Sequence, residues 1–199
     1  MILGITGGTG CGKTTLLSEV EARGGLVLDC DAIYHRLLAT DPGLLSAIDT
    51  AFPGTVQNGQ LDRKMLGSQV FSDPQALELL NAITHRAVKA EVLRQLDGSP
   101  RFAAIDAIAL FEGGLASLCQ FTVAVTAPAE DRVRRLMARD GISEDYARSR
   151  IAAQHQEEWF RSRCHRCLRN DGTREEFRDK CIAFLDTLDI MEEELKRRP

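Results

Sequence analysis

The 199-residue chain lacks a long apolar run, a strong charge of one sign and a large aromatic content. No window approaches the roughly 20 apolar residues of a membrane helix, so we expect no membrane-spanning segment. The first residues, MILGITGG, contain no basic stretch, and we expect no signal peptide. The net charge is only −4, which excludes the global basic field typical of nucleic-acid binders. The sequence therefore predicts a cytoplasmic protein without a membrane or nucleic-acid partner.

Cysteine is present six times, but the pattern indicates neither disulfides nor a metal site. Without an export signal, reduced thiols are the default expectation. Cys164 and Cys167 form a CHRC stretch that resembles half of a zinc site. No second CxxC or HxxxH follows at a suitable spacing, so we predict no metal there.

The remaining composition, 44% apolar and 27% charged residues, is that of a globular protein with one substantial core. Apolar runs that read as buried strands alternate with helical segments, which predicts an α/β doubly wound parallel sheet. Helices are expected at about 13–23 and 173–197. The expected strands are ILGIT (2–6), LVLDC (26–30), FAAIDAIALF (102–111) and FTVAV (121–125).

Two helical regions are too long for simple crossovers between strands. The first, from Ala32 to Gly98, is interrupted at DPG (41–43), FPG (52–54), QNGQ (57–60) and SDP (72–74). The second, about 128–162, is rich in arginine and suggests a lid. We predict a single domain with a core of about 1–31, 100–127 and 164–199, an inserted acceptor-binding helical lobe of about 32–99, and a lid of about 128–163. Nothing in the sequence sets the oligomeric state, and we favour a monomer.

Residues 7–14, GGTGCGKT, match the phosphate-binding loop pattern G-x-x-x-x-G-K-[ST] between an expected strand and an expected helix. Backbone N–H groups of such a loop surround phosphate, and the helix N-terminus adds its positive end. Lys13 would reach the β- and γ-phosphates of ATP, and the Thr14 hydroxyl would hold Mg²⁺. The short length, the helical insert and the absence of a guanine-reading segment favour a small-molecule kinase over a GTPase. The expected nucleotide-binding residues are Gly10, Cys11, Gly12, Lys13, Thr14 and Thr15.

The stretch LVLDCDAIY (26–34) ends an apolar run with Asp29 and Asp31. On an extended strand these side chains would point the same way, and the end of the second strand would lie beside the phosphate-binding loop. One carboxylate would then accept the proton of an attacking hydroxyl, and the other would orient a metal-bound water. The alternative is that one aspartate caps the next helix and the other is solvated. Asp106 is equally open, as a Walker-B-like metal partner or an ordinary strand end.

Several further segments, taken with the loop, resemble the dephospho-CoA kinase family over nearly the whole chain. These segments are GITGGTGCGKT (4–14), DCD (29–31), NGQLDRKMLGSQVFSD (58–73), LNAITHRAV (80–88), AIALFEGGL (107–115), RRLMARDGISEDYARSRIAAQ (134–154) and RNDGT (169–173). The resemblance implies a P-loop kinase fold and ATP-dependent phosphorylation of the ribose 3′-hydroxyl of dephospho-CoA, giving coenzyme A and ADP.

The resemblance also implies roles for individual residues. Asp31 corresponds to the general base, which leaves Asp29 as a metal ligand. Arg139 corresponds to a lid arginine on the transferring phosphoryl group. Three further residues match segments that line the acceptor side: Arg63, His85 and Glu112.

The chain departs from the family pattern at four places. Arg86 stands in place of a proline after the histidine, Ile108 in place of a second proline, Trp159 in place of a lysine, and Cys164-His165 in place of Ala-Asp. Two alternatives stay open. One is another P-loop nucleoside or nucleotide kinase, and the other, favoured by the departures after the lid, is a non-catalytic ATP-binding regulatory protein.

Overall fold

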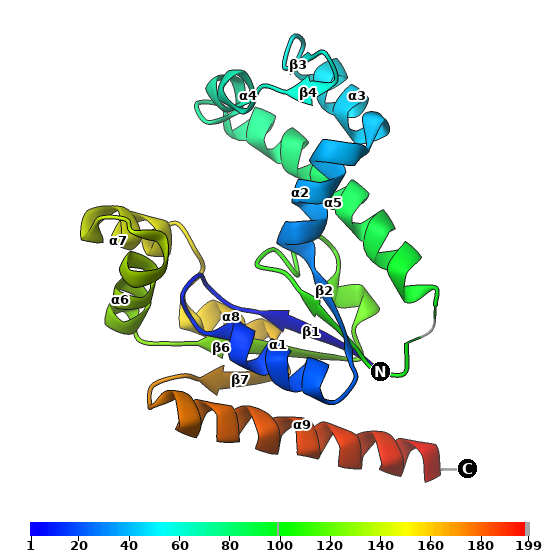
Figure 1. Ribbon diagram of the computed structural model, residues 1–199, viewed down its shortest axis with the longest axis vertical. Helices are drawn as coiled ribbons and strands as arrows, with labels where there is room; N and C mark the ends of the chain where they lie inside the picture. The colour runs from blue at the N-terminus through cyan, green and yellow to red at the C-terminus, as the bar shows by residue number, and fades with distance from the viewer. Residues whose placement is uncertain (99, 198–199) are drawn as a thin grey trace. The chain divides into compact units, whose positions relative to one another are not determined.

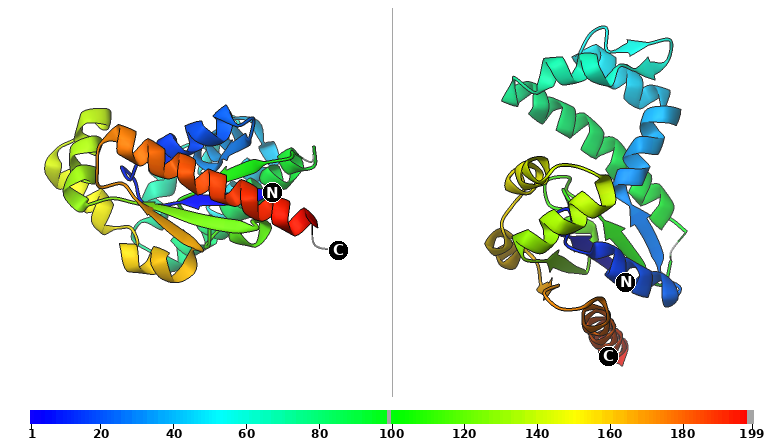
Figure 2. Two further views of the ribbon diagram at one scale, coloured as in Figure 1. Left: turned by 90° about the horizontal axis from the view of Figure 1, so that it is seen from below. Right: turned by 60° about the vertical axis from the view of Figure 1, so that its left-hand side comes forward.

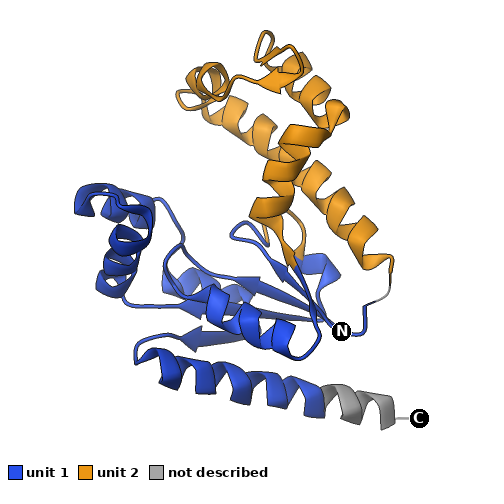
Figure 3. Cartoon of the chain, in the orientation of Figure 1, with its two compact units in different colours: residues 1–27, 100–110, 116–199 blue, residues 28–99, 111–115 orange. Residues whose placement is uncertain are grey.

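The computed structural model describes residues 1–98 and 100–197, and these form two compact units (Figure 3). The first unit comprises residues 1–27, 100–110 and 116–199, and the second comprises residues 28–99 and 111–115. Ser99 and residues 198–199, which belong to the predicted segments 32–99 and 164–199, lie outside the described residues. The division into core, lobe and lid remains a prediction.

The larger sheet has five strands in the order β2-β5-β1-β6-β7. The central strand β1 pairs in parallel with β5 on one side and with β6 on the other, and β6 pairs in parallel with β7. Later strands on both sides of the first strand give the doubly wound topology that the sequence predicts. The strands are β1 (Ile2–Thr6), β2 (Leu26–Asp29), β5 (Ala103–Asp106), β6 (Phe121–Thr126) and β7 (Arg166–Arg169).

Two helices cover one face of this sheet, α1 (Lys13–Ala22) and α9 (Arg174–Arg197), which lie side by side (Figures 1 and 2). Leu3 and Ile5 are two residues apart on β1, so both point to this face, where they are fully buried. On the opposite face α8 (Glu157–Arg163) packs on β6 and β7 (Figure 2). The core between the sheet, α1 and α9 also contains Leu16, Leu17, Val20, Val123, Val125, Phe177, Cys181 and Leu185.

The arginine-rich region after β6 is helical, as predicted. It consists of α6 (Ala129–Asp140) and α7 (Glu144–Ala152), which pack against each other through Val133, Leu136, Ala147 and Ile151. Gly141 ends α6 in the left-handed conformation, with φ of 65°, which glycine adopts at little cost. The Ser143 hydroxyl then accepts a hydrogen bond from the Tyr146 N–H and caps α7.

The second unit contains four helices and a short hairpin among its described residues. Its elements are α2 (Cys30–Thr40), α3 (Pro42–Ala51), β3 (Val56–Gln57), β4 (Gln60–Leu61), α4 (Arg63–Val70) and α5 (Pro74–Leu96). Asp41 and Asp73 each cap a helix whose first residue is proline, which explains two of the predicted breaks. Asn58, with φ of 52°, and Gly59 form the hairpin turn at a third. The core of this unit consists of Leu38, Leu44, Leu45, Ile48, Phe52, Leu66 and Val70.

Two strand predictions are wrong in extent. The strand predicted at 102–111 is β5, which ends at Asp106, because its partner β1 ends at Thr6 and the chain then turns through residues 107–115. The strand predicted at 26–30 ends at Asp29, and Cys30 already belongs to α2. Asp31 is therefore a helical residue, and the alternation of side chains on a strand does not apply to it.

No helix among the described residues has both the length and the apolar character needed to cross a membrane. The 23-residue helix α5, for example, carries Glu78, Arg86, Lys89, Glu91 and Arg94.

Candidate active site

The loop between β1 and α1 has the backbone conformation of a phosphate-binding loop. Gly7, Gly10 and Gly12 have φ values of 137°, 77° and 96°, a region that glycine occupies readily and other residues rarely. A Cβ atom at Gly7 would also lie 2.2 Å from the carbonyl oxygen of Val125. The glycines are therefore required by conformation and by space, and the predicted strand–loop–helix context is confirmed.

Lys13 is the first residue of α1 and lies against the loop. Its Nζ donates a hydrogen bond to the Gly7 carbonyl at 3.3 Å and lies 3.8 Å from Oδ1 of Asp106. The Lys13 and Asp106 side chains are 13% and 17% exposed, so an ammonium and a carboxylate meet in a largely buried setting. Thr14, predicted to hold Mg²⁺, is the second residue of α1 and is exposed.

The sheet order explains why Asp106 is here. We expected the second strand to lie beside the first, but β5 lies between β1 and β2. Asp106, rather than Asp29, therefore ends the strand adjacent to β1. The sequence contained this signal, because an aspartate at the end of an apolar run fits a Walker-B-like position. It could not distinguish that position from an ordinary strand end.

The outer turn of the loop is held by side chains that the sequence analysis did not single out. They come from α6, from the segment after α7 and from the end of β7, and they bond backbone groups of residues 9–11. Arg132 Nε donates to Thr9 O (2.9 Å), Gln154 Oε1 accepts from Thr9 N (2.9 Å), Arg135 Nη1 donates to Gly10 O (3.2 Å) and Cys11 O (3.4 Å), and Asn170 Nδ2 donates to Cys11 O (2.9 Å). Arg135 and Gln154 lie in the segment 134–154 and Asn170 lies in RNDGT (169–173), but the sequence analysis assigned no role to any of them.

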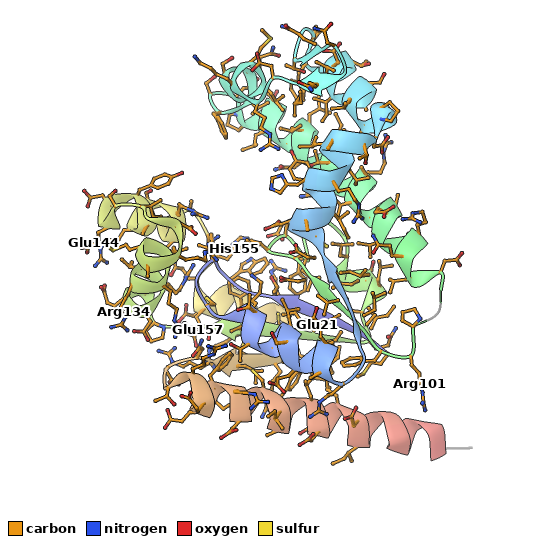
Figure 4. All side chains as sticks on the ribbon, in the orientation of Figure 1. Glu21, Arg101, Arg134, Glu144, His155 and Glu157 are labelled. Carbon is orange, nitrogen blue, oxygen red and sulfur yellow. The ribbon has the colours of Figure 1, made fainter. Side chains whose placement is uncertain are left out.

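A cavity of about 250 Å³ adjoins the loop. It is lined in part by Gly8, Cys11, Thr126, Pro128, Arg132 and His155, the last labelled in Figure 4. Within the described part of the chain, the buried Thr126 hydroxyl has no hydrogen-bond partner, so a polar group aimed at it would be favoured. Burial raises the pKa of the Cys11 thiol, although the charges of Arg132 and Lys13 oppose this shift.

Trp159, one of the departures from the family pattern, packs within the protein. Its ring stacks on His155 with centroids 3.7 Å apart and planes within 2°, and the Arg163 guanidinium lies 4.7 Å from the ring centroid. The other departure after the lid is Cys164-His165, where Nδ1 of His165 accepts a hydrogen bond from the Thr122 N–H at 3.0 Å. Among the described residues, no three potential metal ligands cluster together. All six cysteines are reduced thiols.

Arg139, predicted to contact the transferring phosphoryl group, lies in an exposed ion triad at the end of α6. Its Nε and Nη2 donate to the two oxygens of Asp140 at 2.6 and 3.0 Å, and Arg150 donates to the same carboxylate at 2.9 Å. These hydrogen bonds, that from Arg139 above all, lower the pKa of Asp140 to about 2. The role of Arg139 stays a prediction.

Five predicted site residues belong to the second unit: Asp29, Asp31, Arg63, His85 and Glu112. Asp29 caps α2, since its Oδ1 accepts a hydrogen bond from the Ala32 N–H at 3.0 Å. Asp31 is exposed in the first turn of the same helix. The local structure of the pair therefore matches the alternative given above, in which one aspartate caps the helix (Asp29) and the other is solvated (Asp31).

The three acceptor-side predictions lie on separate elements of the second unit. Arg63 begins α4, and its Nη2 lies 3.5 Å from Nδ1 of His35. His85 is half-buried on α5, and Glu112 lies in the turn after β5. Near Arg63, burial raises the pKa of Tyr34, an effect that the Arg63 charge opposes. Arg63, His35 and Tyr34 thus lie near one another, and the Tyr34 and His35 rings have centroids 5.6 Å apart.

Comparison with known proteins gives matches over most of the chain. The family model described as dephospho-CoA kinase matches residues 1–176. A Deinococcus radiodurans protein described as dephospho-CoA kinase is 37% identical over 193 residues, which cover 94% of this chain and 92% of that protein. A Thermus thermophilus protein with the same description is 38% identical over 191 residues, with the same two shares.

Solved structures agree with these matches. A crystal structure from Thermus thermophilus superposes with a TM-score of 0.79 at 36% identity, covering 94% of this chain and 97% of that one. Shikimate kinase from Acinetobacter baumannii superposes with a TM-score of 0.53 at 15% identity, covering 94% and 92%, which indicates a shared fold alone.

Proposed function

The chain belongs to the dephospho-CoA kinase family, and we propose that it transfers the γ-phosphoryl group of ATP to the ribose 3′-hydroxyl of dephospho-CoA, giving coenzyme A and ADP. The observation that carries the proposal is a phosphate-binding loop with three glycines at positive φ and Lys13 against it, in a chain of this family. Family membership favours this reaction over another nucleotide kinase or a non-catalytic ATP-binding protein.

The loop supplies the positive environment that phosphoryl transfer needs. The transition state is loose, with charge spread over the oxygens of the transferring group, so catalysis depends on positioning and electrostatics. Lys13 places an ammonium beside the loop, and the N-terminal end of α1 adds its dipole. Arg132 and Arg135 add two more cations bonded to the loop. Together they suit a ligand with several negative charges.

The donor set beside the loop fits Mg²⁺, which prefers oxygen ligands. The Thr14 hydroxyl and the Asp106 carboxylate are the oxygen donors we assign to it, and Asp29 stays a predicted third. When bound with ATP, the ion would neutralise charge on the β- and γ-phosphates. Asp106 also orients Lys13, because its carboxylate lies 3.8 Å from the ammonium nitrogen.

Residues of the second unit are proposed to act on the acceptor. Asp31 would accept the proton of the 3′-hydroxyl, and its exposure in the first turn of α2 leaves the carboxylate accessible. Arg63, His85 and Glu112 would bind dephospho-CoA. Arg139, which belongs to the first unit, would give up its hydrogen bond to Asp140 and contact the transferring phosphoryl group. The cavity beside Thr126 and His155 supports binding of the nucleoside of ATP at that place.

The predicted cytoplasmic location and the monomeric state are part of the same proposal. Coenzyme A synthesis uses soluble nucleotides, which fits a protein that acts in the cytoplasm without a membrane partner.

A coupled ADP-release assay tests the proposed function. With Mg²⁺ and ATP, ADP should form when dephospho-CoA is added and should not form with nucleoside monophosphates. Lys13→Ala should lower the turnover by orders of magnitude while the protein stays folded. Release of ADP with a nucleoside monophosphate instead would support the rival kinase, and ATP binding without ADP release would support the regulatory protein.

A further inference from the structure

A single amide oxygen joins the phosphate-binding loop to the helices that follow β6. Oε1 of Gln154 accepts one hydrogen bond from the Thr9 N–H at 2.9 Å and a second from Nη2 of Arg132 at 2.7 Å. Nε of Arg132 donates to the Thr9 carbonyl oxygen at 2.9 Å. The two side chains therefore bond both backbone polar groups of Thr9, and we call this arrangement the Arg132–Gln154 bridge.

The bridge places a buried positive charge against the loop. Arg132 is only 8% exposed, and its two hydrogen bonds go to neutral oxygens, those of Thr9 and Gln154. Burying a guanidinium is costly, and neutral acceptors satisfy its N–H groups without cancelling its charge. The charge therefore adds to that of Lys13 at the place where an anion would bind.

The bridge also lies against the second glycine of the motif, Gly8. The phosphate-binding pattern requires glycine at positions 7 and 12 and leaves position 8 open. A Cβ atom at Gly8 would lie 2.3 Å from Nη2 of Arg132 and 2.9 Å from Oε1 of Gln154. With glycine at position 8, Arg132 and Gln154 reach the loop without having to shift.

The bridge connects the loop to both ends of one helical segment. Arg132 lies in the first turn of α6, and Gln154 follows the end of α7. The rest of α6 and the whole of α7 lie between them in the chain, and the two helices are adjacent (Figure 1). The partners of Thr9 are 123 and 145 residues away in sequence, so its orientation depends on this segment being folded in place.

We propose that Arg132 and Gln154 are positioning residues for the nucleotide: they hold the outer turn of the phosphate-binding loop and raise its affinity for the triphosphate. They act through the backbone and the local charge rather than on the acceptor. The proposal rests on the proposed function only in taking ATP as the ligand of the loop. It predicts that their loss raises the ATP dissociation constant and KM more than it lowers kcat.

Gln154→Glu is the most informative variant. Glutamate has the same length and keeps an acceptor for Thr9 and Arg132, so the fold should be retained, but it adds a negative charge beside the loop. The ATP dissociation constant should rise about tenfold or more at low salt and less at high salt. Arg132→Met, which keeps the length and removes the charge and the donors, should also raise it about tenfold. Arg134→Met is the matched control, since Arg134 is exposed on the same helix and pairs with Asp131 (Figure 4).

The readout is ATP binding by titration calorimetry, with thermal unfolding of each variant measured alongside and kcat and KM determined with dephospho-CoA. ATP binding by Gln154→Glu and Arg132→Met within twofold of the unsubstituted protein would overturn the proposal. If Arg132→Met fails to fold, Gln154→Glu decides alone. A purely structural role predicts lowered thermal stability with unchanged ATP affinity in the folded protein. Weakened ATP binding in a protein that does not phosphorylate dephospho-CoA would reject the proposed function and leave the bridge standing.

Discussion

At the scale of single residues, three aspartates near strand ends have different surroundings. Asp106 ends β5 and faces Lys13, Asp29 caps α2, and Asp31 is exposed in the first turn of that helix. Aspartate thus has three different surroundings: Asp106 is in an ion pair, Asp29 caps a helix, and Asp31 is exposed to solvent. Substitution by asparagine separates these roles, because it removes the charge and keeps the size.

The pair Asp29 and Asp31 gives the first prediction. Asp31→Asn cannot take up a proton, so the turnover should fall on the order of 10²–10⁴-fold while ATP affinity changes little. Asparagine caps helices as well as aspartate does, so Asp29→Asn should change activity only if Asp29 also binds Mg²⁺. Steady-state kinetics over a range of Mg²⁺ concentrations measure both effects, with the helix-capping substitution Asp41→Asn as control. A fully active Asp31→Asn variant would reject the general-base assignment.

Asp106 gives the second prediction. Asp106→Asn should raise the Mg²⁺ concentration needed for half-maximal activity by about 10- to 100-fold, because it removes a carboxylate from the oxygen donors beside the loop. The measurement is ADP release against Mg²⁺ concentration, with Asp97→Asn, an exposed residue at the end of α5, as control. An unchanged requirement would exclude Asp106 as a metal partner.

At the scale of elements, local signals predict most helices and strands, and long-range contacts escape prediction. The Asp-Pro pairs at 41–42 and 73–74 begin α3 and α5 because capping and the fixed φ of proline act within a few residues. The end of β2 was predicted one residue too late, because Asp29 caps α2 and Cys30 already belongs to that helix. The Arg132–Gln154 bridge could not be predicted, since both side chains bond Thr9, which is more than 100 positions away from each in the sequence.

The ion triad at the end of α6 gives the third prediction. Arg139→Ala should lower kcat by about 10²-fold or more, because it removes a cation from the transferring phosphoryl group, and change dephospho-CoA affinity less. Arg148→Ala is the control. Arg148 also forms ion pairs within α6 and α7, but with Glu130 and Glu144 instead of Asp140. If only the KM for dephospho-CoA increased, Arg139 would bind the acceptor instead.

Helix α5 gives the fourth prediction, a pH dependence. Glu91 accepts hydrogen bonds from Arg94 and Gln95 and pairs with Arg36 of α2, and the hydrogen bond from Arg94 is the main cause that lowers its pKa to about 2. A lowered carboxylate pKa stabilises the fold above the unfolded-state value of about 4.5, and this contribution is lost as the pH falls toward 2.

Glu91→Gln should therefore lower the free energy of unfolding by about 1 kcal/mol at pH 7. At pH 3 the difference between variant and unsubstituted protein should be smaller. Urea unfolding at the two pH values measures it, with the exposed Glu78→Gln on the same helix as control. An equal difference at both pH values would show that the Glu91 charge does not contribute.

At the scale of the whole molecule, the chain combines a doubly wound sheet, a phosphate-binding loop and a second compact unit with acceptor-side candidates. The fold class followed from the alternation of apolar strands and helices. The phosphate-binding loop followed from eight consecutive residues. The identity of the acceptor depended on the family resemblance, because no local pattern of charge or polarity specifies a 3′-hydroxyl.

The central claim is tested most directly by the product. The protein is incubated with Mg²⁺, ATP and dephospho-CoA, and the acceptor is recovered and analysed by mass spectrometry and phosphorus NMR. We predict the mass of coenzyme A, a phosphate monoester on the ribose 3′-oxygen, and one ADP for each acceptor converted. Unchanged dephospho-CoA, or a phosphate on any other oxygen, would contradict the claim.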